Sequence, residues 1–338
     1  MSNRTRSIDG FLPSYLMLEL VHRNPGQLWH SQNIVTTQRL WQKSQSGQIW
    51  VPAATGKALI RVYDAKNSYR IPGSKARFEP EGPVSDAVLN KIYEYSVAVR
   101  KFHKDVLGIN SMDDLGMDYI NTGHYGQKYN NAYNNGTQMV FGDGDGDIFV
   151  TFVLLDVVAH EDGHEITGKT CALEYQDQAG ALNEHLSDVD GVVCRQYTLK
   201  LSADQDTWLI GPGIFSDKVN GRALRDMLNP GTAYDDKRLG KDPQPDHMSK
   251  YVQTSQDNGG VHFNSGIPNK AFAVFAKAVG GNSWESSYLV WKQIRHEIQS
   301  DCDFQTFADK SVDICKRVLP KEVQKLKDAW AAVGIKVA

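Results

Sequence analysis

Two histidines separated by three residues, His160 and His164, constrain this chain more than any other feature, because they enclose Glu161 in a helix-forming segment. Residues four apart share one face of a helix, so both imidazoles can reach one metal ion while Glu161 projects beside them. Glu184 follows after nineteen intervening residues. Two imidazoles and one carboxylate form a zinc set that leaves a coordination position for water. The spacing predicts a catalytic zinc site; a chance pair of surface histidines is the alternative.

A second helix is predicted around Glu184, because apolar residues recur there at helical spacing from Leu182 to Val193. Glu184 and Asp188 lie four residues apart and therefore share a face of that helix. We expect Asp188 to accept the free ring N–H of a ligand histidine, which would fix its tautomer and orientation. The alternative is that both carboxylates are solvated.

Four further side chains complete the candidate chemistry. His262 follows Asp257 by five residues across a glycine pair, so Asp257 can orient the imidazole and favour its protonated form for stabilising an oxyanion. An ordinary loop histidine is the alternative. Tyr175 can offer a phenolic hydrogen bond to the same charge, and the planar fork of Arg225 can bind a substrate carbonyl.

Composition excludes several classes of function. The net charge of −3 on 338 residues does not indicate a surface that binds nucleic acid or a membrane. No apolar run is long enough to span a bilayer. The first ten residues lack the apolar stretch of a secretory signal, so we expect a cytoplasmic protein or export by a route that needs none. The four cysteines show no CxxC pairing, which argues against a thiolate zinc site and leaves their redox state open. We expect a monomer.

The order of predicted elements indicates a strand-rich half followed by a helical half. Two helices are expected at 11–23 and 31–43, followed by a linker at Ser44–Gln48. Strands with turns are expected from Lys57 to Pro72, and a twisted antiparallel sheet over 118–155. Further helices are expected at 88–108, 156–167, 181–200, 268–279, 284–297, 304–318 and 321–333.

The order of these motifs resembles that of thermolysin-like zinc metallopeptidases over nearly the whole chain from about residue 58. Within that family the chain looks most similar to protealysin-type precursors, which carry a short propeptide with a Pro-Pro-Tyr-Met-Leu-like segment. Leu12-Pro13-Ser14-Tyr15-Leu16-Met17-Leu18 matches that segment in part. The segments that carry the family resemblance are Asn131-Ala132, Val157-Val158-Ala159-His160-Glu161, Gly180-Ala181-Leu182-Asn183-Glu184, Leu224-Arg225 and 257–268; those that carry the protealysin resemblance are Tyr63-Asp64-Ala65, 231–236 and 240–245.

The resemblance implies an α+β, thermolysin-like two-domain fold with the active-site cleft between the domains. Residues 1–52 would be an inhibitory propeptide acting in cis, residues 53–155 a β-rich N-terminal catalytic domain, and residues 156–338 an α-helical C-terminal catalytic domain. The substrates would be polypeptides, cut before large hydrophobic residues.

The resemblance also implies residue roles. His160, His164 and Glu184 would bind one zinc ion, and Glu161 would take the proton from the zinc-bound water. Tyr175 and His262 would stabilise the oxyanion. The remaining roles concern the substrate: Asn131 and the Ala132 backbone would hold it as an added strand, Arg225 would grip its carbonyl, and Val157, Ile210, Leu224 and Phe149 would line an apolar pocket.

Several positions depart from the family pattern. Asp162 and Gly163 stand where the family usually has Leu-Thr, and Asn134 replaces a usual Trp near the substrate strand. Of the acidic residues that make the family's double calcium site, Asp156 is kept while Arg195 takes a ligand position. Because an arginine repels a divalent cation, we expect no paired calcium there. The Asp-Gly repeat at 142–147 lacks the closing Glu of an EF-hand and is interpreted as a tight turn.

Three functions compete. The first is a zinc endopeptidase made as a self-inhibited precursor. The second, suggested by Asp162, Gly163 and Asn134, is a zinc-binding fold that has lost catalysis and acts as a binding module. The third is a zinc aminopeptidase, although the spacing between His164 and Glu184 is one residue longer than those enzymes usually have.

Overall fold

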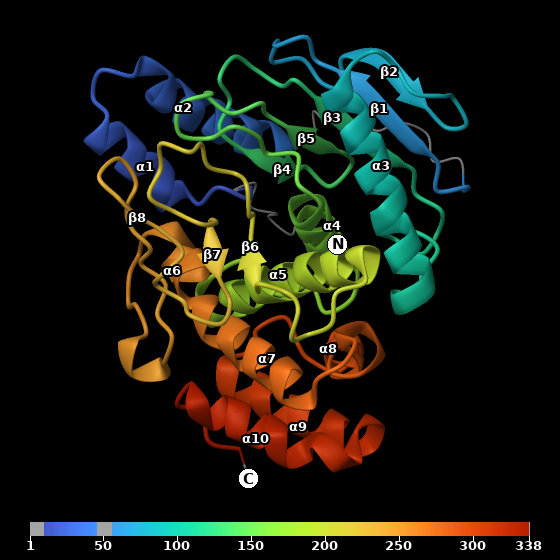
Figure 1. Cartoon of the computed structure of the whole chain (residues 1–338), viewed down its shortest axis with the longest axis vertical. Coiled ribbons are helices and arrows are strands. Elements are labelled where there is room, and N and C mark those ends of the chain that lie inside the picture. The colour runs from blue at the N-terminus through green and yellow to red at the C-terminus, as the bar shows by residue number, and fades with distance from the viewer. Residues whose placement is uncertain (1–9, 46–55, 338) are drawn as a thin grey trace.

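The computed structural model describes residues 10–45 and 56–337 (Figure 1). The proposed domain boundary at 52/53 and most of the predicted linker at Ser44–Gln48 lie outside these residues. Two helices come first, α1 (Ser14–Arg23) and α2 (Leu28–Gln45), so the helix continues through Ser44, where a linker was expected. In Figure 1 both helices lie against the strand-rich half, and α1 also approaches the β7–β8 region of the other half.

A five-stranded sheet forms the next layer, in the order β2-β1-β3-β5-β4. The strands are β1 (Ile60–Asp64), β2 (Ser74–Phe78), β3 (Tyr119–Gly123), β4 (Ala132–Asn134) and β5 (Met139–Phe141). The outer pairs β1–β2 and β4–β5 are antiparallel, but β1–β3 and β3–β5 are parallel. The prediction of an antiparallel sheet over 118–155 was therefore wrong in part. The reason is that the chain leaves β3, passes over one position to form β4 at the edge, and returns as β5 between them, so β5 runs parallel to β3. The parallel pairing of β1 with β3 has a separate cause, the long helical crossover between them.

That crossover is α3 (Ala87–Phe102), which the apolar spacing predicted. Asp86 caps its N-terminus by accepting hydrogen bonds from the backbone N–H groups of Val88 and Leu89 at 2.9 and 3.0 Å. A π-helical turn, His103–Leu107, extends the helix to Gly108, whose φ of 77° ends it. The helix buries its apolar stripe between the sheet and the helical half (Figure 1).

The helical half is built around α4 (Leu155–Lys169) and α5 (Asp177–Leu199), which pack side by side in the centre of the molecule (Figure 1). The other helices are α6 (Asp257–Asn264), α7 (Gly266–Val279), α8 (Tyr288–Ile294), α9 (Phe304–Val318) and α10 (Val323–Ala332), with short 3₁₀ turns at Met248–Lys250, Ser283–Glu285 and Pro320–Glu322. Two small antiparallel pairs complete this half, β6 (Leu209–Ile210) with β7 (Arg225–Asp226) and β8 (Asp235–Asp236) with β9 (Gly240–Lys241). A mixed α+β architecture with a sheet-bearing and a helical part is thus confirmed.

Glycines allow α4 and α5 to approach closely. A Cβ added at Gly163 would lie 3.0 Å from Asp190 Oδ2 and 3.1 Å from Ser187 Cα, and one at Gly191 would lie 2.7 Å from the Asp156 carbonyl oxygen. A larger residue at either position would push the helices apart. The close packing of α4 on α5 therefore explains why a glycine stands at position 163. The helix stays regular there despite the low helix propensity of glycine.

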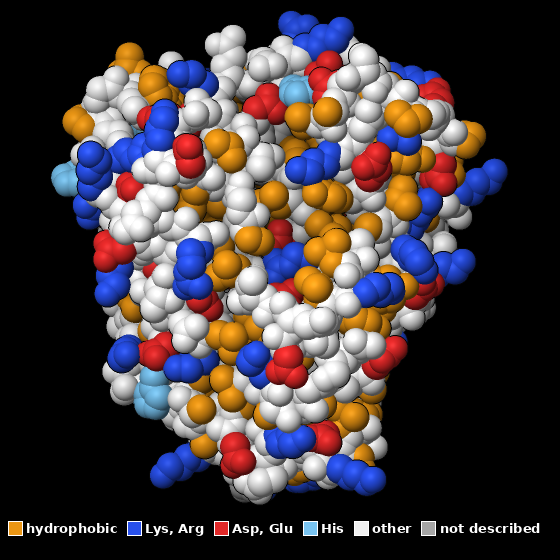
Figure 2. All heavy atoms as spheres, viewed as in Figure 1, with side chains coloured by type: hydrophobic (Ala, Val, Ile, Leu, Met, Phe, Trp, Pro, Cys, Tyr) orange, Lys and Arg blue, Asp and Glu red, His pale blue; other side chains and the backbone are white. Residues whose placement is uncertain are grey.

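The surface agrees with the mild net charge. Figure 2 shows basic and acidic side chains interspersed over the face in view. Among the described residues, the helices are too short or too polar for any of them to cross a bilayer. The four cysteines are buried free thiols.

Candidate active site

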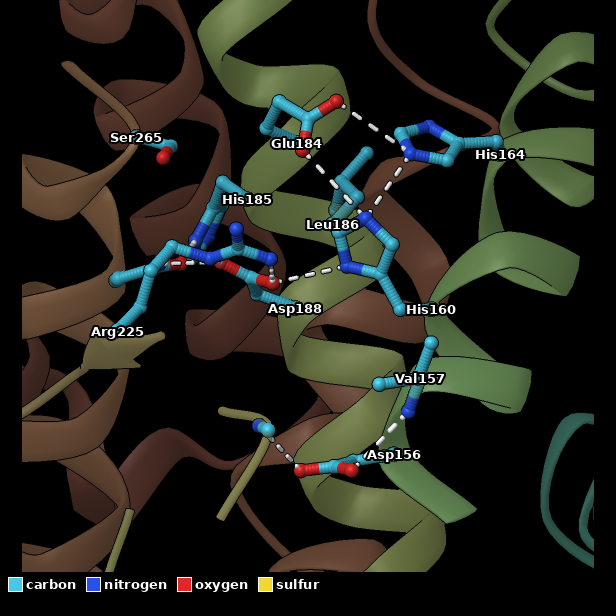
Figure 3. A network of polar contacts seen from close by, with 12 residues as sticks. Asp156, Val157, His160, His164, Glu184, His185, Leu186, Asp188, Arg225 and Ser265 are labelled. Carbon is cyan, nitrogen blue, oxygen red and sulfur yellow. Dashed lines mark hydrogen bonds and ion pairs between the residues drawn. The ribbon is translucent and has the colours of Figure 1, made fainter. Parts of the chain in front are cut away.

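His160 and His164, from α4, and Glu184, from the facing side of α5, converge on one point (Figure 3). The Nε2 atoms of the two imidazoles are 3.1 Å apart, and the Glu184 carboxylate oxygens lie 3.5 Å from His160 Nε2 and 3.4 Å from His164 Nε2. One donor atom from each residue falls within 4.8 Å of the others. The three predicted ligands are therefore brought together, on helices whose contact fixes their separation.

The donor set fits a zinc ion. Both imidazoles present the same ring nitrogen, and Glu184 is buried with one oxygen, Oε2, that makes no hydrogen bond to the described residues. Burial raises the pKa of Glu184, but the neighbouring imidazoles of His262, His164 and His160 outweigh burial and hold it well below its usual range. The carboxylate is thus available as an anionic ligand beside two nitrogen donors.

Outer partners orient each imidazole. His160 Nδ1 lies 2.8 Å from Asp188 Oδ1, as the sequence predicted, and His164 Nδ1 lies 2.8 Å from Asn183 Oδ1. Such contacts set the tautomer that presents Nε2 to a metal. Asn183 was missed, although its place just before Glu184 on α5 was a usable signal. Burial lowers the pKa of His164 to about 4, which favours its neutral form. Burial also lowers the pKa of His160, but Asp188 and Glu184 outweigh it and raise that pKa to about 9, so a metal ion would displace a proton from His160 on binding.

Asp188 is itself the centre of a buried network (Figure 3). Its Oδ1 and Oδ2 accept hydrogen bonds from Arg225 at 2.6 and 2.8 Å, and Oδ2 accepts a further one from Asn269 at 2.8 Å. Burial raises the pKa of Asp188, but Arg225 and His160 more than offset this and keep it below its usual value. Arg225 therefore serves as the counter-charge of Asp188 in this structure.

Glu161 lies on α4 beside strand β4. Its Oε2 accepts a hydrogen bond from the backbone N–H of Asn134 at 3.0 Å, and the Asn134 amide donates to the Glu161 carbonyl at 3.3 Å. Its Oε1 has no hydrogen-bond partner among the described residues. Burial raises the pKa of Glu161 to about 7, which suits a group that must both accept and release a proton. Asn134 thus holds the carboxylate through its backbone, a contact that does not need the usual Trp side chain.

Tyr175 and His262 face the same point from the far side. The Tyr175 hydroxyl hydrogen-bonds to Glu184 Oε1 and lies 3.4 Å from His262 Nε2. His262 Nδ1 lies 2.7 Å from Asp257 Oδ1, and its backbone N–H donates to Asp257 Oδ2 at 2.8 Å. Positive φ angles of 81° and 83° at Gly259 and Gly260 make the turn that folds Asp257 back onto the ring. The predicted orienting contact is therefore present.

The N-terminal segment occupies the cleft between the two halves. The Phe11 backbone N–H donates to the Ala132 carbonyl at 2.9 Å, and the Leu12 N–H donates to Asn131 Oδ1 at 2.8 Å. Phe11 is fully buried, with its ring edge-on to His160 and with the Arg225 guanidinium carbon 4.8 Å from its centroid. Asn131 and Ala132 were predicted to hold a substrate strand; here they bind the backbone of Phe11 and Leu12, which form a bend in this same chain.

Three of the residues predicted to line an apolar pocket belong to the elements that contact Phe11. Val157 lies on α4 one turn before His160 (Figure 3), and Ile210 and Leu224 belong to the β6–β7 region. A Cβ added at Gly211 would lie 3.3 Å from two Phe11 ring carbons and 3.7 Å from Leu224 Cβ. Phe149 is buried against Phe152 and Phe215, and its ring contacts among the described residues do not include Phe11.

Comparison with known proteins identifies the family. A model of the thermolysin metallopeptidase catalytic domain matches residues 30–168, and a model of the alpha-helical domain of the same peptidases matches residues 171–335. The chain belongs to the thermolysin metallopeptidase family. It is therefore a metalloendopeptidase, and the family implies zinc at the cluster of His160, His164 and Glu184.

Individual relatives confirm the resemblance to protealysin-type precursors. The precursor of protealysin from Serratia proteamaculans superposes with a TM-score of 0.85 at 39% identity, covering 96% of this chain and 99% of that one. An extracellular metalloprotease of Pectobacterium carotovorum is 39% identical over 99% of this chain and 98% of its own length. Protease PrtS of a Photorhabdus strain is 43% identical over 100% of this chain and 95% of its own length. Membership of this endopeptidase family argues against the binding-module and aminopeptidase alternatives.

Proposed function

We propose that the chain is made as a self-inhibited precursor and, once its propeptide is removed, cuts polypeptides before large hydrophobic residues. Residues 1–52 would be the propeptide, and residues 53–155 and 156–338 the two catalytic domains. The single observation that carries the proposal is Phe11, which lies buried against His160 in the apolar region where a substrate side chain would bind. The Pectobacterium relative, named as extracellular, favours action outside the cell among the locations left open.

The blocked cleft supports self-inhibition. Phe11 and Leu12 use the hydrogen-bonding groups of Ala132 and Asn131 that a substrate strand needs. The helix that follows adds contacts outside the cleft, for example the stacking of Tyr15 on Phe263 with ring centroids 4.1 Å apart. A substrate could bind only after this segment had left.

The apolar surroundings of Phe11 support the substrate preference. Burying a Phe or Leu side chain there is worth about 1.5–3 kcal/mol relative to leaving it in water. A positively charged side chain at that position would lie against Arg225, and a carboxylate would have to compete for Arg225 with Asp188, which already binds it. Polypeptides with a large hydrophobic residue after the scissile bond are therefore the expected substrates of a monomeric enzyme.

The site residues divide the chemical work. Zinc, held by His160, His164 and Glu184, would supply the Lewis acid that polarises the scissile carbonyl and acidifies water. Glu161 would accept the proton of the attacking water at its free Oε1 and pass it to the leaving amide nitrogen. The Tyr175 hydroxyl and the His262 ring, oriented by Asp257, would donate hydrogen bonds to the developing oxyanion. Arg225 would grip a substrate carbonyl beyond the cut.

The test is the behaviour of the purified full chain and its Glu161→Gln variant. The wild type should shorten itself at the N-terminus on storage, seen by mass spectrometry, and then hydrolyse casein and a long blocked peptide. Glu161→Gln should stay intact and lose at least about 10³-fold in activity while keeping its zinc, because only the proton acceptor is removed.

A matched control is Glu165→Gln, which alters another buried carboxylate on α4, one that pairs with Lys169 at 3.5 Å. This variant should keep most of the activity. Failure of the zinc-loaded, shortened wild-type chain to cut either substrate would contradict the proposal. Cleavage of only unblocked peptides would instead favour an aminopeptidase.

A further inference from the structure

The guanidinium of Arg195 is buried beside strand β6. Arg195, on α5, is 7% exposed and faces two buried carboxylates, Asp156 at the start of α4 and Asp206 in the loop before β6. Its Nη1 donates to Asp156 Oδ2 at 2.5 Å, and its Nη2 and Nε donate to Asp206 at 2.7 and 3.3 Å. One cation therefore binds two carboxylates that approach it from different segments of the chain.

The same group holds the strand that borders the cleft. Arg195 Nη1 donates to the Leu209 carbonyl in β6 at 2.7 Å, and Asp156 Oδ2, which it binds, accepts from the Gly211 N–H at 2.9 Å. Figure 3 shows the Asp156 carboxylate reaching both the backbone at Val157 and the chain segment opposite. The two neighbours of Ile210 are thus linked by hydrogen bonds to the Arg195 guanidinium, Leu209 directly and Gly211 through Asp156.

The tied segment is the one that contacts the ring in the cleft. Gly211 lies against Phe11 and Leu224, and Ile210 pairs with Arg225, whose guanidinium lies over the same ring. Trp208, which precedes β6, adopts a φ of 61°, so this part of the chain is not held by regular structure alone. A shift of β6 would therefore change the shape of the region around Phe11.

We propose that Arg195 is a positioning residue for the substrate pocket, a built-in cation that fixes β6 against α4 without a metal ion. Removing its charge would leave two buried carboxylates and a backbone carbonyl converging with no counter-charge, a set of oxygen atoms that suits a hard cation. The loop from Thr207 to Gly211 would then loosen unless a cation from solution replaced the guanidinium. The pocket's role in substrate choice rests on the proposed function; the positioning of β6 does not.

The first experiment measures β6 directly and needs no activity. Amide hydrogen exchange is followed in zinc-loaded full chain carrying Glu161→Ala, with and without Arg195→Gln. Exchange in the segment 207–211 should quicken at least about tenfold in the Arg195→Gln chain and slow again in millimolar Ca²⁺, with little change elsewhere. Unchanged exchange in this segment would overturn the proposal, and so would quickening that Ca²⁺ does not reverse, since a cation would then not be what Arg195 supplies.

The control is Arg100→Gln, which removes a guanidinium with the same kind of partners in the other half. Arg100 binds both oxygens of Glu79 at 2.6 and 2.9 Å and the Ala58 carbonyl at 2.8 Å. This variant should leave exchange at 207–211 unchanged. Equal quickening there in both variants would mean general destabilisation and would overturn the proposal.

The second experiment measures substrate binding and turnover in chains that have removed their own propeptide. For peptides with Phe after the cut, Arg195→Gln should raise KM about tenfold with little change in kcat, because binding rather than proton transfer is disturbed. Arg195→Lys should recover part of this loss, since an ammonium keeps the charge but cannot span both carboxylates. A fall in kcat at unchanged KM would overturn the pocket role. If no variant, wild type included, cleaves peptide, the proposed function fails while the exchange result still decides the role of Arg195.

Discussion

The ring of Phe11 lies edge-on to the imidazole of His160, with 5.3 Å between the ring centroids and an interplanar angle of 87°. Phe11 precedes the strand-rich half in the sequence and His160 follows it, yet the two side chains meet at the centre of the candidate site. His160 belongs to the cluster that could hold a metal ion, so under the proposed function a side chain placed against it would also block the approach of a substrate.

Phe11→Ala should weaken this block. Loss of a buried Phe ring removes about 1.5–3 kcal/mol of apolar stabilisation, equivalent to about 10–100-fold in the fraction of open chains. Unprocessed Phe11→Ala should therefore hydrolyse a fluorogenic peptide at least about tenfold faster than unprocessed wild type and should shorten itself sooner. Activity is measured directly after purification, before any cleaved product accumulates. Leu18→Ala, at an exposed position of α1, is the control and should behave as wild type. If unprocessed Phe11→Ala hydrolysed the peptide no faster than this control, the result would contradict a blocking role for Phe11.

Asp188→Asn should weaken zinc binding and the fold together. The neutral amide no longer supports the Nδ1–H of His160, so zinc affinity, measured by competition with a chelator, should fall about 10–100-fold. Arg225, 2% exposed, loses its counter-charge, so the free energy of unfolding should fall by about 3–5 kcal/mol. Asp226→Asn is the matched control, since Asp226 is also buried but pairs with the half-exposed Arg222. An unaltered zinc affinity in Asp188→Asn would contradict the orienting role.

The part of the site that depends on short spacing could be predicted from sequence. The helical repeat brings His160 and His164 to one face, and the five-residue interval across a glycine pair brings Asp257 to His262. Phe11 and Arg195 could not be found in this way, because a single apolar residue or a single buried cation has no spacing signal and acquires its role from distant segments. Similarly, helices were predicted well from local periodicity, whereas the parallel pairing of β1 with β3 depends on how the chain crosses over.

Asp162→Leu should stabilise the protein without loss of zinc. Asp162 is 1% exposed, and neither of its oxygens has a hydrogen-bond partner among the described residues. Burial, together with Glu161 and Glu165, raises the pKa of Asp162 well above its usual range. The buried side chain of Asp162 is therefore a neutral carboxylic acid. Replacing it with Leu, the usual family residue here, should raise the free energy of unfolding by about 1–2 kcal/mol in urea titrations.

Asp162→Asn is the matched control, because it keeps an unpartnered polar group of the same size and should change stability by less than about 0.5 kcal/mol. A large loss of peptide hydrolysis in Asp162→Leu, at full zinc occupancy, would show instead that the acid takes part in function.

His124 should make stability fall at alkaline pH. Its Nδ1 lies 2.9 Å from both oxygens of Asp143 and its Nε2 lies 3.2 Å from Asp86, the residue that caps α3. The hydrogen bond to Asp143, opposed by burial and aided by the charge of Asp86, raises the pKa of His124 to about 9. Since the unfolded value is about 6.5, the stabilisation is fully present below pH 6.5 and is lost as the pH rises through 9.

The expected size is about 1–2 kcal/mol, less than the full shift would give, because both carboxylates are partly exposed to solvent. In urea titrations of the Glu161→Ala chain, His124→Gln should therefore lower the free energy of unfolding at pH 6 and lose most of that difference near pH 10. Asp143→Asn should reduce the pH dependence in the same direction, because it removes the main partner of the imidazolium. A His124→Gln difference that stays constant from pH 6 to 10 would mean that His124 is neutral in the folded protein and acts through packing alone.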